Sequence, residues 1–121
     1  MRGARGAIGA RGEAAAVAYL NNHGYEILAT NLRTPYGELD ALCSKEGVLI
    51  AVEVKTRRSR AFGLPEEAVT QAKLAHIAAA LAHYRQIHDV PDGVDQRIDV
   101  VAIDLAASGQ PREIRLIEAV E

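Results

Sequence analysis

The sequence predicts an α/β domain, and three observations support this prediction. Two alanine-rich segments, residues 9–23 and 66–87, have the composition of helices. An apolar and largely β-branched run at 48–52, bounded by Gly47, is typical of a central strand that is covered on both faces. Turn-forming residues separate the other apolar stretches, so the predicted element order is α-β-β-β-α-β-β. The four remaining strands are expected at 25–32, 36–43, 97–104 and 113–119.

Length and composition are those of one folded domain. The chain has 121 residues, of which 49% are hydrophobic, enough for a single core. Its apolar runs are too short to span a bilayer, and its N-terminus has no apolar signal-peptide core. The single cysteine, Cys43, excludes an intramolecular disulfide and suits a small core position. We therefore expect one cytoplasmic domain at 1–121, with the glycine- and arginine-rich residues 1–8 mobile.

The net charge of −2 is divided unevenly along the chain. Residues 1–60 carry nine Lys and Arg against six Asp and Glu, a balance of +3, whereas residues 61–121 carry five against ten, a balance of −5. This asymmetry fits a polyanion-binding face on an acidic body, and it also fits ordinary solvated surface charge. The basic residues gather at the N-terminus and after the central strand, at Arg2, Arg5, Arg11, Arg57, Arg58 and Arg60.

A carboxylate extends the apolar stripe of the first predicted helix. The stripe consists of Ala16, Val17 and Leu20, and Glu13 lies one turn before it. A carboxylate at the end of a core-facing stripe should point toward the rest of the protein. The alternative is that Glu13, in the first turn of a helix starting at Gly9, stabilises the helix dipole.

The strand 36–43 and the central strand should form an antiparallel hairpin, because the segment between them is a short polar turn with glycine at its end. If Ser44 pairs with Gly47, the numbers of paired residues sum to 91. A register that differs by one residue would move every side chain of the first strand to the opposite face.

This register gathers acidic side chains on one patch. Asp40 faces Ala51 and Glu38 faces Glu53, so alternation along the strands places Asp40, Glu53 and Lys55 on one face, with Asp40 diagonal to Glu53. Like charges opposed on a sheet are destabilising, and a divalent cation would relieve the repulsion. Ligands that are all oxygen select Mg²⁺ or Mn²⁺. Lys55 would stabilise a phosphate oxygen or help to position an attacking water.

These residues also carry a resemblance. Asp40 with Glu53-Val54-Lys55 resembles the PD-(D/E)XK signature of the restriction-endonuclease-like superfamily. The whole chain more closely resembles the uncharacterised YraN-like bacterial family, which is similar in motif layout to archaeal Holliday-junction resolvases. The matching stretches are GARGEAAAVAYLNNHGYEILATNLR, YGELDAL, VEVKTR, FGLPEEAV followed by Lys73, and RIDVVAI.

The resemblance implies a restriction-endonuclease-like three-layer fold, with a mixed central sheet flanked by helices. It implies metal-dependent hydrolysis of DNA phosphodiester bonds, including branched DNA, by a symmetric homodimer like the resolvases. Asp40 and Glu53 would bind the metal ion. Glu13 takes the place of a glutamate on the first helix of the resolvases, as a third ligand or to orient water, and Lys55 would stabilise the transition state. Asp40 stands in GELD rather than in a Pro-Asp pair, and this departure does not affect a proposed ligand.

Other residues are candidates for support of this site. Lys73 occupies a family position and could contact phosphate, or it could be an ordinary solvated lysine. Gln71 extends the stripe of the second helix and could hydrogen-bond in the site, or it could be a surface amide. Asp99 is expected to have a structural role, paired with Arg97 or Arg33. The basic loop suits phosphate contacts with one stacking aromatic, through Arg57, Arg58, Arg60 and Phe62.

Two other functions fit the same residues. The first is a nucleic-acid-binding module that keeps the fold without turnover. It predicts salt-sensitive binding that depends on the arginine loop and not on Asp40. The second is a domain whose acidic patch is one end of a surface ion network, and this alternative predicts no specific site for Mg²⁺ or Mn²⁺.

Overall fold

A computed structural model describes residues 4–58, 61 and 63–121 of the protein, without the side chains of residues 4–11. The order of its elements agrees with the predicted one, with a short 3-10 helix added before the second helix. The helices are α1 (Ala4–Asn22), η1 (Pro65–Ala68) and α2 (Gln71–Ile87). The strands are β1 (Glu26–Thr34), β2 (Gly37–Lys45), β3 (Val48–Arg57), β4 (Gln96–Leu105) and β5 (Pro111–Ile117).

The five strands form one mixed sheet in the order β1-β2-β3-β4-β5. Only the β3–β4 pair is parallel, and the other three neighbouring pairs are antiparallel. Parallel neighbours need a long crossover connection, and here η1 and α2 provide it. The central strand that the apolar run predicted is therefore β3, with β2 on one side and β4 on the other.

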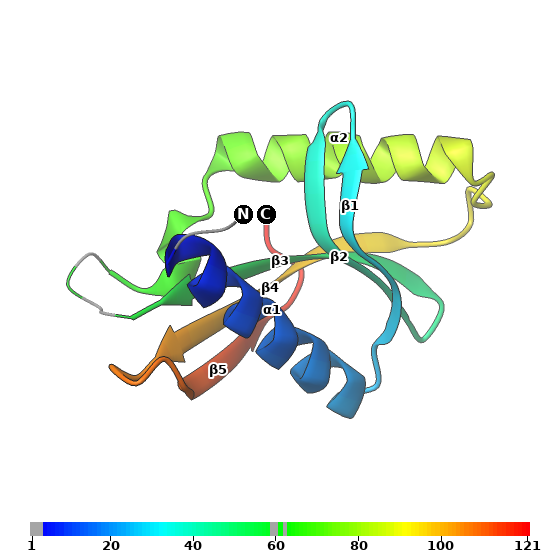
Figure 1. The fold of residues 1–121 in the computed structure, drawn as a ribbon. Helices are drawn as coiled ribbons and strands as arrows, with labels where there is room; N and C mark the ends of the chain where they lie inside the picture. The colour runs from blue at the N-terminus through cyan, green and yellow to red at the C-terminus, as the bar shows by residue number, and fades with distance from the viewer. Residues whose placement is uncertain (1–3, 59–60, 62) are drawn as a thin grey trace.

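The two long helices cover opposite faces of the sheet (Figure 1). On one face, Ala16 and Leu20 of α1 belong to a core cluster with Val52. On the other face, Ile77 and Leu81 of α2 belong to a cluster with Ala51. Neighbouring residues of β3 thus enter different clusters, as the alternation of side chains along a strand requires. Both faces of β3 are buried, which explains its nearly continuous apolar run.

The helix boundaries differ from the predicted ones at the N-terminal ends. The helix α1 begins at Ala4 rather than Gly9, so residues 4–8 belong to the helix, and the expected mobility of residues 1–8 stays a prediction. The helix α2 begins at Gln71 rather than Glu66, because Thr70 is extended and its side chain caps the helix by accepting a 3.1 Å hydrogen bond from the Lys73 amide. The segment before this cap forms the separate helix η1.

Burial within the helices follows the predicted stripes closely. In α2, the predicted stripe residue Ala78 is exposed, and Ala80 is buried instead beside the correctly predicted Leu74, Ile77 and Leu81. Cys43 is completely buried, as expected for a small core residue.

The predicted hairpin forms, but its register differs by two residues from the predicted one. Lys45 pairs with Val48 and Ala41 pairs with Val52, so paired numbers sum to 93 rather than 91. The turn consists of Glu46 and Gly47, which have φ values of 51° and 79°. A tight two-residue hairpin turn requires a positive φ at both of its residues. Gly47 is therefore the second residue of the turn, whereas the predicted register placed it just after the turn.

Candidate functional site

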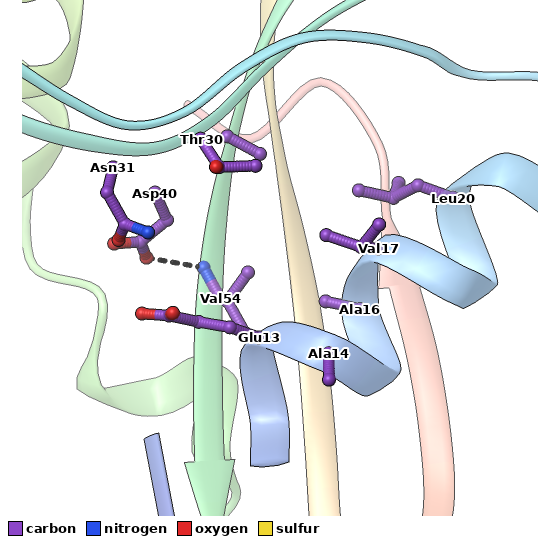
Figure 2. A pocket seen from close by; sticks show the side chains of 10 residues that line it. Glu13, Ala14, Ala16, Val17, Leu20, Thr30, Asn31, Asp40 and Val54 are labelled. Carbon is purple, nitrogen blue, oxygen red and sulfur yellow. Dashed lines mark hydrogen bonds between the residues drawn. The ribbon is translucent and has the colours of Figure 1, made fainter. Parts of the chain in front are cut away.

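The candidate site lies where β2 separates from β3. Their pairing ends at Ala41 and Val52, although β3 continues and stays paired with β4 on its other side. Asp40 is the first residue of β2 beyond the last pair. Its Oδ2 atom accepts a 2.8 Å hydrogen bond from the backbone amide of Val54 (Figure 2). The Asp40 carboxylate therefore satisfies a backbone donor of β3 at the point where the partner strand leaves.

A local irregularity turns Asp40 toward α1, contrary to the prediction that it shares the face of Glu53. Leu39 and Leu42 both pack on the α2 side of the sheet. The consecutive residues Asp40 and Ala41 both line a cavity beneath α1. Strict alternation cannot place consecutive residues on one face, so β2 departs from regular pleating here. The predicted face was wrong for this reason, and not because of the two-residue change in register.

Glu53 approaches Asp40 from the other side of the separation. It alternates with Ala51, which packs in the α2-side cluster, and its side chain is almost fully buried. Burial is the main cause that raises the pKa of Glu53 to about 8, and a hydrogen bond and charge repulsion from Asp40 add to it. When protonated, the Glu53 carboxyl donates this hydrogen bond to Asp40. The two acidic groups that the sequence singled out are therefore in contact.

Two lysines surround the Glu53 carboxylate. Lys73 Nζ lies 3.4 Å from Glu53 Oε2, and it comes from the first turn of α2. Lys55 alternates with Glu53 along β3, and its charge also favours the ionised carboxylate. Both lysines oppose the effect of burial and of Asp40 on the pKa of Glu53. Lys73 was expected as a phosphate contact, whereas the structure brings it to a carboxylate of the site.

Glu13 reaches the same region from α1. It lines the cavity with Asp40, and Figure 2 shows the two side chains at the same end of that cavity. The preceding residue, Gly12, is buried against β3, and a Cβ atom there would overlap the side chain of Thr56. This close approach sets the position of Glu13. Because α1 begins at Ala4, Glu13 is not in the first turn, and the predicted alternative of a helix-dipole role does not apply.

One residue of this region, Asn31, was not singled out by the sequence. It lines the cavity beside Asp40 and has a φ of 51° within β1. Asparagine tolerates positive φ better than most residues, yet such a residue inside a strand is unusual and is often found at functional sites. The only signal in the sequence was the polar Asn31 within an otherwise strand-like stretch, and it was too weak to separate from an exposed position.

Two expected supporting residues have other partners. Glu38 does not face Glu53, because β2 and β3 are no longer paired at that point. Its side chain instead lies 3.9 Å from Arg33 Nε on β1. Gln71 is exposed, and its amide donates a 3.2 Å hydrogen bond to the backbone carbonyl of Glu121. That contact ties α2 to the C-terminal end of the chain rather than to the carboxylates.

The basic loop is only partly described. Arg57 ends β3 and is half-buried, and Arg58 is exposed beyond it. Arg60 and Phe62 lie outside the described residues, as do Arg2 and the side chains of Arg5 and Arg11. Alternation from Glu53 and Lys55 places Arg57 on the α2 side of the sheet, in line with both.

The donor chemistry of the site fits a hard divalent cation. Asp40 and Glu53 offer only carboxylate oxygens, the preferred ligands of Mg²⁺ and Mn²⁺. Burial first, and the nearby Asp40 second, raise the pKa of Glu53, and a cation bound between the two carboxylates would favour the ionised form. Among the described residues, no three His, Cys, Asp or Glu side chains already converge as a complete metal-binding group. The carboxylates of Asp40 and Glu53 are thus in contact, and Glu13 lies at the same end of the cavity as Asp40.

A second acidic cluster on the same sheet is fully satisfied. Asp99 is completely buried on β4 and accepts hydrogen bonds from Arg97 Nε at 3.0 and 3.2 Å, from Tyr25 Oη at 2.8 Å and from the Ala119 amide at 2.9 Å. Burial, with the hydrogen bond to Asp99, raises the pKa of Tyr25. The structure confirms the expected pairing with Arg97, and Asp99 joins β4, the start of β1 and the C-terminal segment.

None of the helices in the described part of the chain is long and apolar enough to cross a membrane.

Comparisons with known proteins identify relatives of this chain. Residues 12–103, which span the candidate site, match the model of Uncharacterised protein family UPF0102. A UPF0102 protein of Roseiflexus castenholzii is 39% identical over 117 residues, covering 97% of this chain and 94% of the relative. One of Caldicellulosiruptor bescii is 40% identical, covering 92% and 93%, and one of Beutenbergia cavernae is 44% identical, covering 90% and 92%. The chain therefore belongs to family UPF0102, the YraN-like family that its sequence resembles.

Proposed function

We propose that the protein is a metal-dependent nuclease that hydrolyses DNA phosphodiester bonds, with Mg²⁺ or Mn²⁺ as its cofactor. The observation that carries this proposal is the contact between Asp40 and Glu53 at the separation of β2 from β3, with Lys55 and Lys73 beside the buried Glu53. A buried acid whose pKa is perturbed, in contact with a second carboxylate and close to lysines, is typical of catalytic sites. The mixed sheet between two helices agrees with the restriction-endonuclease-like fold that we propose for this chain.

Each residue has a role in this proposal. Asp40 and Glu53 hold the metal ion, and Glu13 acts as a third ligand or orients the attacking water. The bound ion supplies Lewis-acid stabilisation and lowers the pKa of a coordinated water. Lys55 stabilises the charge that develops on the phosphate in the transition state. Lys73, which lies 3.4 Å from Glu53 Oε2, would contact a phosphate oxygen of a substrate held at these carboxylates.

The substrate is held by its backbone in this proposal. Arg57 follows Glu53 and Lys55 on the same face of β3, and Arg58 extends the positive charge into solvent. Such residues contact phosphates without reading sequence. A symmetric dimer would present two sites to the two strands of a branched DNA, which is the substrate that the resemblance favours.

The test is a cleavage assay on branched, linear and single-stranded DNA, with Mg²⁺, Mn²⁺ or EDTA. We expect cleavage that requires the cation and falls about 100-fold or more in Asp40→Asn and Lys55→Ala, the size typical of lost transition-state stabilisation. Asp92→Asn, in an exposed loop, is the matched control and should cut like the wild type. If none of the substrates is cut, or if Asp40→Asn cuts normally, the proposal is wrong.

A second candidate is a nucleic-acid-binding module without turnover. The observation that favours it is the 3.4 Å ion pair, in which Lys73 already neutralises Glu53 in place of a metal ion. This function predicts DNA binding that weakens with salt and upon Arg58→Ala, and that does not depend on Asp40 or on a divalent cation. Fluorescence anisotropy with labelled DNA, with and without Mg²⁺, separates it from the nuclease.

A further inference from the structure

A cavity of about 390 Å³ opens directly beside the proposed catalytic carboxylates. Its walls come from α1 on one side and from β1, β2 and β3 on the other (Figure 2). Glu13 and Asp40 occupy one end, and most of the remaining wall is aliphatic. Its volume falls in the range of roughly 300–1,000 Å³ that is usual for sites of small organic groups. The aliphatic wall consists of Ala14, Ala16, Val17, Leu20, Ala41 and Val54.

The polar residues of the cavity wall besides the two carboxylates are Thr30 and Asn31, which are neighbours on β1. Both are exposed, and both turn to the α1 side because the strand is irregular here, while Ala29 and Leu32 pack on the α2 side. Figure 2 shows the Asn31 amide at the carboxylate end of the cavity. A primary amide offers a donor and an acceptor side by side, the pattern that matches the hydrogen-bonding edge of a nucleobase.

We propose that this cavity receives an unpaired nucleobase next to the phosphodiester that is cut, and that Asn31 hydrogen-bonds to its edge. This inference rests on the proposed nuclease function and names its substrate class: DNA in which the base beside the cut is not paired. A base inside a duplex cannot enter the cavity unless it leaves the stack, which costs a few kcal/mol. Single-stranded DNA and the unpaired bases of branched DNA avoid that cost.

A neutral group fits the cavity better than a phosphate does. The described residues that line the cavity include no cation, and Glu13 and Asp40 at the end of the cavity would repel an anion. The phosphate then lies at the carboxylates and lysines, with the adjoining base extending into the cavity. The positive φ of Asn31 within β1 agrees with this role, since unusual backbone conformations are frequent at functional sites.

The experiment uses the full chain with Lys55→Ala, which keeps the carboxylates but should not turn over. The probe is branched DNA carrying 2-aminopurine at each position around the junction in turn, with Mg²⁺ present. A base that leaves the stack and enters the cavity should raise the 2-aminopurine fluorescence at one position beside the junction. A flat response at every position, while anisotropy shows that the DNA is bound, would overturn the inference.

Two further substitutions close the cavity or remove the amide. Ala14 is exposed on α1 and lines the cavity, so Ala14→Phe should fill it without disturbing the core. We expect Ala14→Phe and Asn31→Ala to abolish the fluorescence rise and to weaken binding about tenfold, roughly the net contribution of one hydrogen bond or of a small buried apolar contact. The matched controls, Ala78→Phe on α2 and Asn21→Ala on α1, are also exposed and should bind as before.

The outcomes separate this inference from the nuclease proposal. If the wild type cuts single-stranded and fully paired DNA equally well, and Ala14→Phe has no effect, the nuclease stands and the base cavity is wrong. If no DNA is bound or cut, the proposed function itself fails. If Ala14→Phe changes the oligomeric state by light scattering and leaves DNA binding intact, the cavity is a protein interface and the inference is wrong.

Discussion

Two buried carboxylates on the same sheet, Asp99 and Glu53, are treated very differently by their surroundings. Asp99 receives an arginine, a tyrosine hydroxyl and a backbone amide, so its charge is balanced at all times. The neighbours of Glu53 are the Asp40 carboxylate, the 39% exposed side chain of Lys73 and, through its charge, Lys55. The partners of Asp99 stabilise the fold. The partners of Glu53 balance the charge of the two carboxylates incompletely, and a bound cation would complete that balance. Burial alone therefore does not distinguish a structural acid from a functional one, whereas the identity of its partners does.

The largest effect on stability is expected when Asp99, whose hydrogen bonds are all made, is removed. Asp99→Ala leaves Arg97 without its buried partner and should lower the free energy of unfolding by about 3–5 kcal/mol, as measured by urea denaturation. Asp40→Asn removes like charge from the other cluster and should change stability by less than about 1 kcal/mol while abolishing cleavage. If Asp40→Asn lowers the free energy of unfolding more than Asp99→Ala does, the distinction between the two acids is wrong.

The next effect concerns the close approach of α1 to β3. Gly12→Ala introduces a Cβ that overlaps Thr56, and it should cost about 1–3 kcal/mol, the usual range for an overpacked core. Because α1 must move away from the sheet, Glu13 moves too, and cleavage should fall more than stability does. The control is Gly93→Ala, where a Cβ meets no atom within 4 Å. Equal losses of activity in the two variants would show that the position of Glu13 is unimportant.

A smaller effect is expected from pH. The pKa of Glu53 is raised in the folded state from 4.5 to about 8, so between these values the folded protein binds a proton that the unfolded chain has released. The contribution of Glu53 to stability is therefore present below pH 4.5 and is lost as pH rises to 8. We expect the Tm of the wild type, relative to Glu53→Gln, to fall by several degrees over this window.

Added Mg²⁺ should reverse that loss, and more so at pH 8 than at pH 5, because it binds the ionised pair. The difference between wild type and Glu53→Gln isolates this group from the other carboxylates and the histidines. A Mg²⁺ effect of the same size in both proteins would contradict the assignment of Glu53 as a ligand.

The smallest effect is expected at Lys73, since its side chain is partly exposed. Lys73→Met should change the free energy of unfolding by less than about 1 kcal/mol. It should weaken DNA cleavage about tenfold, because the substrate loses one phosphate contact. It should also raise the pKa of Glu53 further, shifting the pH profile of cleavage upward. If the pH profile of cleavage is unchanged in Lys73→Met, Lys73 does not act on Glu53 in the candidate site.

The sequence predicted the order of the elements because that order depends on local patterns, and it singled out Glu13, Asp40 and Glu53, which the structure brings to one region. The apolar run of β3 identified the central strand, and one helical turn back from Ala16 identified Glu13. The register failed because glycine was placed beside the turn rather than within it. The face of Asp40 and the position of Asn31 were beyond prediction, since both follow from an irregularity shared by β1 and β2 that simple alternation does not contain.

The tight turn at Glu46 and Gly47 links the position of the site to the packing of the core. It fixes how far the chain runs from Asp40 to Glu53, because both strands are paired without interruption from the turn to the point of separation. A slip of one residue in this pairing would carry Asp40 away from Glu53 and turn the core-facing side chains of one strand to the opposite face. One register therefore fixes both the core and the place of Asp40, so the site cannot be rearranged here without disrupting the core.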